Sequence, residues 1–216
     1  MKMGAIFDQD GLLFDTEAVY QRSWVAAGKQ MGLDVPFAFC TAVSGTSGPG
    51  MEAVIRRFFP DVEPQPFIDL CFKLSYEEQD RCLPEKPGLH EILELLHRRG
   101  VKIAVASSSF RDRVERNLET SGIRVYFDVI TTRDDISNGK PDPEIFLVAA
   151  ERLGLDPSDC YVFEDSFNGV RAGHAAGCFT VMVPDLAQPD ETLAGQYDAC
   201  CESLLDAARQ IAQGIL

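Results

Sequence analysis

The chain has 216 residues and is 45% hydrophobic, which is enough to bury one ordinary core together with a small second lobe. Its 34 acidic and 20 basic residues give a formal net charge of −14, which argues against nucleic acid or an anionic membrane surface as a partner. Seven scattered cysteines without a CxxC pair exclude a disulfide framework and a zinc site. No apolar run approaches the roughly 20 residues of a membrane span, and the N-terminus lacks the pattern of a signal peptide. We therefore expect a cytoplasmic protein, and we expect it to be a monomer.

The predicted elements fall into two groups along the chain. A short apolar run, Ala5 to Phe7, reads as a buried strand, and the next segment shows only helical spacing, in residues 17–32, 50–60 and 66–83. From residue 88 onward, helices and strands alternate. Helices are predicted over 88–100, 109–122, 141–155, 167–177 and 199–216, and strands over 101–109, 127–132, 159–166 and 178–184.

This order predicts an α/β fold. Strands separated by single helices require crossover connections, which produce a parallel sheet covered on both sides. We expect a Rossmann-like doubly wound parallel sheet formed by residues 1–15 and 84–216, with an inserted all-helical cap domain formed by residues 16–83.

Polar side chains follow the predicted strands at the points where the strands end. Asp8 and Asp10 follow the first strand, Ser107 to Ser109 end the second, Lys140 lies in the loop after the third, and Glu164 and Asp165 end the fourth. Ligands of open α/β sheets bind beyond the carboxyl ends of the strands, so these groups are expected to converge.

The convergent groups have a common chemical use. Asp8 and Asp165 can share a hard divalent cation such as Mg²⁺, which prefers oxygen ligands and offsets carboxylates that would otherwise repel a phosphate. Ser107 and Lys140 can stabilise a phosphoryl group. One aspartate is then left to attack phosphorus, and a second, two residues along, to protonate the leaving alcohol. Taken singly, each residue also suits a turn, a helix cap or a solvated loop, so the prediction depends on their conjunction.

The complete pattern resembles the haloacid dehalogenase-like superfamily, in particular its phosphatases and phosphoglucomutase-like members with a helical cap. The motifs that carry the resemblance are DQDGLLFDTE (8–17), VASSS (105–109), NGKPDPEIF (138–146) and VFEDSFNGV (162–170). The resemblance implies that Asp8 is the nucleophile and Asp10 the general acid and base. It also implies phosphate binding by Ser107, Ser108 and Lys140. The implied Mg²⁺ ligands are Asp8, the backbone carbonyl of Asp10 and Asp165, with Glu164 acting through water.

The substrate is expected to be a small phosphorylated metabolite, specifically a sugar phosphate. The expected cap loop, residues 41–50, places Ser44, Gly45, Thr46 and Ser47 as candidate substrate contacts, although the same stretch suits a plain helix connector. That loop has no Lys or Arg, and Tyr20 stands where the similar sugar phosphomutases carry histidine. Both departures weaken the alternative of a phosphosugar mutase with the same aspartyl-phosphate intermediate. An alternative of another class is a non-catalytic phosphometabolite-binding protein, against which the presence of both Asp8 and Asp10 argues.

Overall fold

The structure is a computed structural model that describes residues 1–44, 46, 48–185 and 188–216. The chain divides into two compact units. The core unit comprises Met1–Phe14 and Glu85–Leu216, and the inserted unit comprises Asp15–Pro84. Among the described residues, no helix combines the length and the apolar character that crossing a membrane requires.

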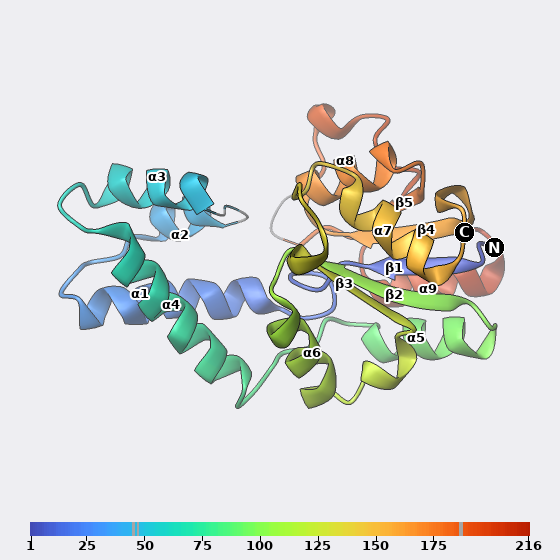
Figure 1. The fold of residues 1–216 in the computed structure, drawn as a ribbon, viewed down its shortest axis with the longest axis horizontal. Coiled ribbons are helices and arrows are strands. Elements are labelled where there is room, and N and C mark those ends of the chain that lie inside the picture. Colours follow the sequence, from blue (N-terminus) through green and yellow to red (C-terminus); the bar gives the residue numbers. More distant parts are fainter. Residues whose placement is uncertain (45, 47, 186–187) are drawn as a thin grey trace. The chain divides into compact units, whose positions relative to one another are not determined.

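A parallel sheet forms the centre of the core unit (Figure 1). Its strands are β1 (Gly4–Phe7), β2 (Lys102–Ser107), β3 (Val129–Thr132), β4 (Cys160–Glu164), β5 (Phe179–Met182) and β6 (Ala199–Cys200). In the described part of the chain they lie in the order β3-β2-β1-β4-β5-β6, and every pair is parallel. The predicted fold class, a Rossmann-like doubly wound α/β fold, is confirmed.

Helices cover both faces of this sheet (Figure 1). The helices of the core unit are α5 (Leu89–Arg98), α6 (Arg111–Thr120), α7 (Glu144–Leu153), α8 (Phe167–Ala175) and α9 (Leu204–Gln213). The chain moves outward from β1 to β3 and then returns past β1 to β4 and β5, so right-handed crossovers put α5 and α6 on one face and α7 and α8 on the other. The C-terminal helix α9 packs beside α5.

Apolar residues explain why β1 lies at the centre. Its four residues are all buried, because strands on both sides and helices on both faces enclose it. Phe7 pairs in register with Phe163 of β4, and their rings stack with centroids 4.7 Å apart. The first polar residues after these two phenylalanines, Asp8 and Glu164, are therefore held side by side at the same edge of the sheet.

The inserted unit consists of helices around an aromatic core. They are α1 (Thr16–Gln30), α2 (Phe37–Val43), α3 (Gly48–Phe58) and α4 (Pro64–Gln79). Trp24 is 3% exposed and meets the rings of Phe39 and Phe67 edge to face, at 5.3 and 4.9 Å between centroids. These aromatics pack the unit internally. The role of the unit as a cap stays a prediction.

Two short elements were not predicted from the sequence. The helix α2 takes up Phe37–Val43, and Gly48 begins α3, so the expected cap loop 41–50 is reduced to the residues between these helices. The prediction of a single helix over residues 199–216 was also wrong at its start, since Ala199–Cys200 form the edge strand β6 before α9 begins at Leu204. Both elements are too short to produce a clear periodic pattern.

The chain leaves and re-enters the core unit at neighbouring positions. Phe14 and Glu85 form an antiparallel bridge, and the backbone N–H of Lys86 donates to the carbonyl of Leu13 at 2.9 Å. Within the inserted unit, the N–H of Asp15 donates to the carbonyl of Pro84 at 2.9 Å. The two connections therefore run together as a short antiparallel ladder.

Candidate active site

The candidate site lies at the carboxyl ends of β1, β2 and β4, in the core unit. Asp8 directly follows β1, and its backbone N–H donates to the carbonyl of Phe163 at 3.1 Å, which continues the sheet ladder by one residue. Ser107 ends β2 and Glu164 ends β4. The strand register therefore brings together groups that are far apart in the sequence.

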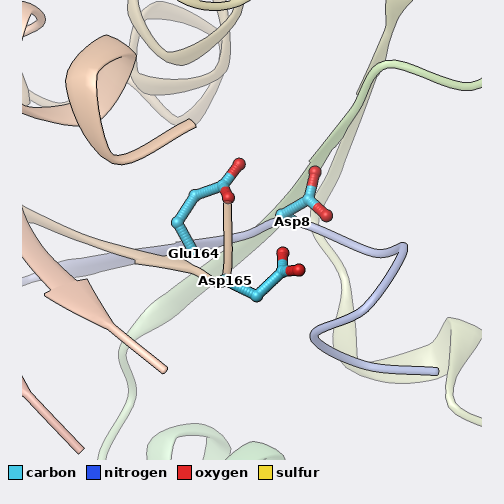
Figure 2. A group of neighbouring side chains, drawn as sticks. All are labelled: Asp8, Glu164 and Asp165. Carbon is cyan, nitrogen blue, oxygen red and sulfur yellow. The ribbon is translucent and has the colours of Figure 1, made fainter. Parts of the chain in front are cut away.

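Three carboxylates form the acidic cluster of the site: Asp8, Glu164 and Asp165 (Figure 2). Each offers an oxygen within 4.8 Å of the other two, and these groups are buried. In Figure 2 the side chains of Asp8 and Asp165 extend to the same side, beyond the ends of two adjacent strands. Three buried carboxylates at this spacing repel one another, so the cluster requires positive charge nearby.

Lys140 supplies one such charge. Its side chain is 7% exposed, and its Nζ donates to Oδ1 of Asp8 at 2.5 Å and to Oε1 of Glu164 at 2.6 Å. A third hydrogen bond of 3.1 Å joins it to the carbonyl of Ala106, at the end of β2. All three ammonium donors are thus engaged, and the ammonium group links Asp8, Glu164 and the end of β2.

The pKa values of Asp8, Asp165 and Lys140 are shifted from their ordinary values. Burial raises the pKa of Asp8 to about 8 against the opposing effect of Lys140, and the charge of Glu164 adds to the rise. Burial and the neighbouring carboxylates also raise the pKa of Asp165. Burial alone would lower the pKa of Lys140, but the charges of Asp8 and Glu164 outweigh it and raise that pKa. A divalent cation among these oxygens would favour the ionised form of both aspartates.

Asp10 is held by hydroxyl groups from the end of β2. Its Oδ2 accepts a hydrogen bond of 2.8 Å from the hydroxyl of Ser109 and one of 3.3 Å from that of Ser107. The oxygen of Ser107 in turn accepts from the N–H of Ser109 at 3.0 Å. Ser108 is exposed at the same strand end. Ser109 had no role in the sequence prediction, although its position two residues after Ser107 could have indicated one.

Glycines make room for the carboxylates. Gly11 has a φ of +86°, and a Cβ built there would overlap the carboxylate of Asp165. A Cβ at Gly169, in the first turn of α8, would overlap the carboxylate of Glu164. That carboxylate also accepts from the N–H and the hydroxyl of Ser166 at 3.0 and 2.9 Å. These close approaches fix where the acidic groups point.

The residues present suit a hard divalent cation. Carboxylate oxygens are the ligands that Mg²⁺ prefers, and Mg²⁺ takes only one or two of them together with water and substrate phosphate. Within the part of the chain that the structure describes, the buried Oδ1 of Asp165 has no hydrogen-bond partner. A buried carboxylate oxygen without a partner is costly, so a cation or a water molecule is expected to contact it.

The predicted cap-loop residues belong to the inserted unit, and their hydroxyls bond within it. The hydroxyl of Ser44 donates to the carboxylate of Glu17, and that of Thr46 donates to the carbonyl of Val43 at 2.6 Å. Gly45 and Ser47, also predicted as substrate contacts, lie outside the described residues. The involvement of this loop in substrate binding stays a prediction.

Residues 5–183 match the haloacid dehalogenase-like hydrolase family. The chain belongs to this family. The match covers every strand of the core sheet except β6, together with the inserted unit and all the site residues described above. The family predicted from the four sequence motifs is therefore confirmed.

Relatives within the haloacid dehalogenase-like family include named phosphatases. A phosphorylated carbohydrates phosphatase of Thermotoga maritima is 34% identical over 176 residues, which are 80% of each chain. A Drosophila melanogaster protein described as a pseudouridine-5'-phosphatase is 37% identical over 199 residues, which cover 83% of this chain and 80% of that one. A solved structure from Thermotoga maritima, assigned as a beta-phosphoglucomutase, covers all of both chains with a TM-score of 0.83 and 27% identity. The predicted enzyme class, a phosphoric monoester hydrolase, is confirmed by the family and its phosphatase members.

Proposed function

We propose that the protein is a magnesium-dependent phosphatase that hydrolyses a small phosphorylated metabolite through an aspartyl phosphate on Asp8. The observation that carries the proposal is that Asp8 contacts Nζ of Lys140 at 2.5 Å and also lies close enough to the carboxylates of Glu164 and Asp165 to share one ion with them. A buried aspartate at a strand end, next to both a cationic side chain and a candidate cation site, is arranged as a nucleophile toward phosphorus.

In the first step, an oxygen of Asp8 forms a bond to phosphorus while the bond from phosphorus to the leaving alcohol oxygen breaks. Asp10 gives its proton to that oxygen, and the serine hydroxyls of β2 hold its carboxyl group in place. Lys140 stabilises the charge that develops on the phosphoryl oxygens.

In the second step, water attacks the phosphorus of the aspartyl phosphate. Asp10, now a carboxylate, accepts a proton from that water, and the bond between phosphorus and Asp8 breaks to release inorganic phosphate. Asp8, Asp165 and the backbone carbonyl of Asp10 would hold the cation, with Glu164 beside them. When bound, Mg²⁺ offsets the negative charge of the phosphoryl group against the carboxylates.

A sugar phosphate is the proposed substrate class. The support is the phosphorylated carbohydrates phosphatase, which resembles this chain over four-fifths of both lengths. The hydroxyl groups of Ser44 and Thr46 are proposed as cap contacts, for which they would have to exchange their present internal hydrogen bonds. The proposed location is the cytoplasm, and the proposed enzyme acts as a monomer.

A phosphosugar mutase is the second candidate, and the structural similarity to the beta-phosphoglucomutase favours it. A mutase would use the same aspartyl phosphate but return the phosphoryl group to the sugar. Tyr20 argues against this candidate, because its ring packs against Phe72, with centroids 5.7 Å apart, and it has none of the basic character of a histidine.

The deciding experiment measures inorganic phosphate release from a panel of sugar and nucleoside monophosphates, with Mg²⁺ present or chelated. The variant is Asp8→Asn, and the matched control is Asp128→Asn, whose carboxylate accepts from the N–H of Ile103 at 2.8 Å before the start of β3. We expect release that needs both Mg²⁺ and Asp8 and that Asp128→Asn retains.

Two results would contradict the proposal. Negligible release across the panel, with isomerisation of hexose 1-phosphates primed by a bisphosphate, would indicate the mutase. Tight binding of phosphorylated compounds without turnover in either assay would indicate a binding protein.

A further inference from the structure

A second, partly buried ion pair lies beside the acidic cluster and has no part in the mechanism above. Nζ of Lys86 and Oδ1 of Asp185 are 2.6 Å apart, and the two side chains are only 19% and 14% exposed. Lys86 lies just before α5 and Asp185 lies after β5, at a separation of 99 residues in the chain. The electrostatic attraction within a partly buried pair is stronger than that within a fully exposed pair.

The second oxygen of Asp185 faces the acidic cluster. A Cβ built at Gly11 would overlap the carboxylate of Asp165 and lie 3.4 Å from Oδ2 of Asp185, so both carboxylates border the same small space above the Gly11 backbone. Among the residues that the structure describes, neither this Oδ2 nor Oδ1 of Asp165 has a hydrogen-bond partner, although both are buried. Buried acceptors need hydrogen-bond donors or positive charge, and two that border one space can share the same source.

Direct ligation of a cation does not account for Asp185. In the described part of the chain, the group of carboxylates close enough to share one ion consists of Asp8, Glu164 and Asp165, without Asp185. A magnesium ion usually keeps several of its water molecules, and groups behind the direct ligands accept hydrogen bonds from such waters.

We propose that Asp185 is a positioning residue for the divalent cation, accepting hydrogen bonds from its water ligands through Oδ2, and that Lys86 fixes the carboxylate of Asp185 in this orientation. The inference rests on the cation site of the proposed function and adds an outer layer to it. Lys86 also joins that layer to the point where the chain re-enters the core unit, because its backbone N–H binds the carbonyl of Leu13.

The direction in which removal of Lys86 changes cation affinity distinguishes a positioning role from a purely electrostatic one. If the ammonium group acted only through its charge, its removal would reduce repulsion and tighten cation binding. If it holds Asp185 in place, its removal must weaken cation binding, because Asp185 is then free to turn away. Loss of Asp185 weakens binding in both cases, so Lys86 is the informative position.

The test is titration with Mn²⁺ alone, followed by the electron paramagnetic resonance signal of the free ion, for the full chain and its variants. We expect Lys86→Met and Asp185→Asn each to raise the Mn²⁺ dissociation constant about tenfold, the typical lower bound for loss of an outer-layer partner. The double variant should bind Mn²⁺ no more weakly than Asp185→Asn, because the two side chains act together and either change removes the same interaction. Matched controls are Lys102→Met, whose Nζ donates to the carbonyl of Leu153 at 2.6 Å, and Asp128→Asn; both should bind as the unchanged protein does.

Tighter or unchanged Mn²⁺ binding by Lys86→Met, or unchanged binding by Asp185→Asn, would overturn the inference. If Lys86→Met fails to fold because Asp185 is left buried without a counter-charge, the double variant, which lacks both charges, replaces it, and wild-type affinity in that variant overturns the inference. Asp165→Asn separates this inference from the proposed function. If it weakens binding while the Lys86 and Asp185 variants do not, only the outer layer is refuted. If it leaves Mn²⁺ binding unchanged, the cation site itself is refuted.

Discussion

The hydroxyl of Ser109 donates a hydrogen bond of 2.8 Å to Oδ2 of Asp10, the proposed general acid and base. The two residues come from the ends of neighbouring strands, and the hydroxyl of Ser107 approaches the same oxygen at 3.3 Å. The two serine hydroxyls therefore orient the carboxyl group of Asp10 before a substrate binds. Such preorganisation lowers the reorganisation needed in the transition state.

Replacing Ser109 should therefore slow the reaction without greatly weakening substrate binding. For Ser109→Ala we expect kcat to fall about tenfold, within the usual contribution of general acid–base catalysis, while KM changes less. Ser109→Thr, which keeps the hydroxyl, should restore most of kcat. Steady-state phosphate release measures both parameters, with Ser121→Ala as the control because its hydroxyl donates to the carbonyls of Asn117 and Leu118 at the end of α6. A rise in KM at constant kcat would assign Ser109 to substrate binding instead.

Lys140 should be essential for stability as well as for activity. Its removal in Lys140→Met leaves the buried carboxylates of Asp8 and Glu164 without the cation that now contacts both. We expect the free energy of unfolding in metal-free buffer to fall by about 3–5 kcal/mol, the usual effect of breaking a buried ion pair. Urea unfolding measures the change. The double variant Lys140→Met/Glu164→Gln should recover part of the loss, and no recovery would show that carboxylate repulsion is not its cause.

Gly11 should tolerate no side chain, for two separable reasons. Its φ of +86° strains any L-residue, and a Cβ would also overlap the carboxylate of Asp165. Gly122 is a matched control, because its φ is +71° but, among the described residues other than its chain neighbours, none has an atom within 4 Å of a Cβ there. Both alanine variants should lose about 1 kcal/mol of unfolding free energy from backbone strain. Only Gly11→Ala should also lose phosphatase activity and cation affinity, and equal activity in the two variants would contradict the overlap.

The acid stability of the core unit should depend on Asp135. Burial acts to raise the pKa of Asp135, but hydrogen bonds from Arg152 and Thr132 and the charge of Arg111 lower it to about 2. Between pH 4 and 2 the unfolded chain binds a proton that the folded chain does not, so this contribution to stability is complete above pH 4 and is lost as the pH falls toward 2.

The corresponding variant is Asp135→Asn. We expect its free energy of unfolding at pH 7 to be lower by roughly 1–2 kcal/mol, and the difference from the unchanged protein to shrink as the pH falls from 4 to 2. Urea unfolding at a series of pH values measures the difference. A constant difference down to pH 2 would show that the carboxylate charge of Asp135 is not responsible.

The sheet and the candidate site could be predicted from the sequence because apolar runs form the strands and polar residues follow at the carboxyl ends of these strands. In a parallel sheet, the run that ends at Phe7 and the run that ends at Phe163 have their carboxyl ends at the same edge, and the observed register puts Asp8 beside Glu164. The convergence of polar groups at the strand ends could thus be predicted without any knowledge of side-chain geometry. The helix α2, in contrast, has seven residues, too few for its period to stand out from the neighbouring connections.

Other features could not be predicted because they depend on distances across the fold. Lys86 and Asp185 look like solvated surface charges in the sequence, and only the packed core unit shows that they form a partly buried ion pair. The same holds for Gly169, whose contact with Glu164 depends on how α8 begins after β4. Sequence patterns report which face of an element is apolar, but not which atoms meet once the elements have packed.

The antiparallel bridge between Phe14 and Glu85 brings together the two points at which residues 15–84 join the core unit. Because the two ends of this segment are already paired, a turn of about two residues could join them without moving β1 or α5. The inserted unit could therefore be exchanged for one of different size or sequence while the catalytic strand ends stay in place. If the inserted unit contacts the substrate, as proposed above, such an exchange would alter substrate preference and leave the residues that carry the chemistry unchanged.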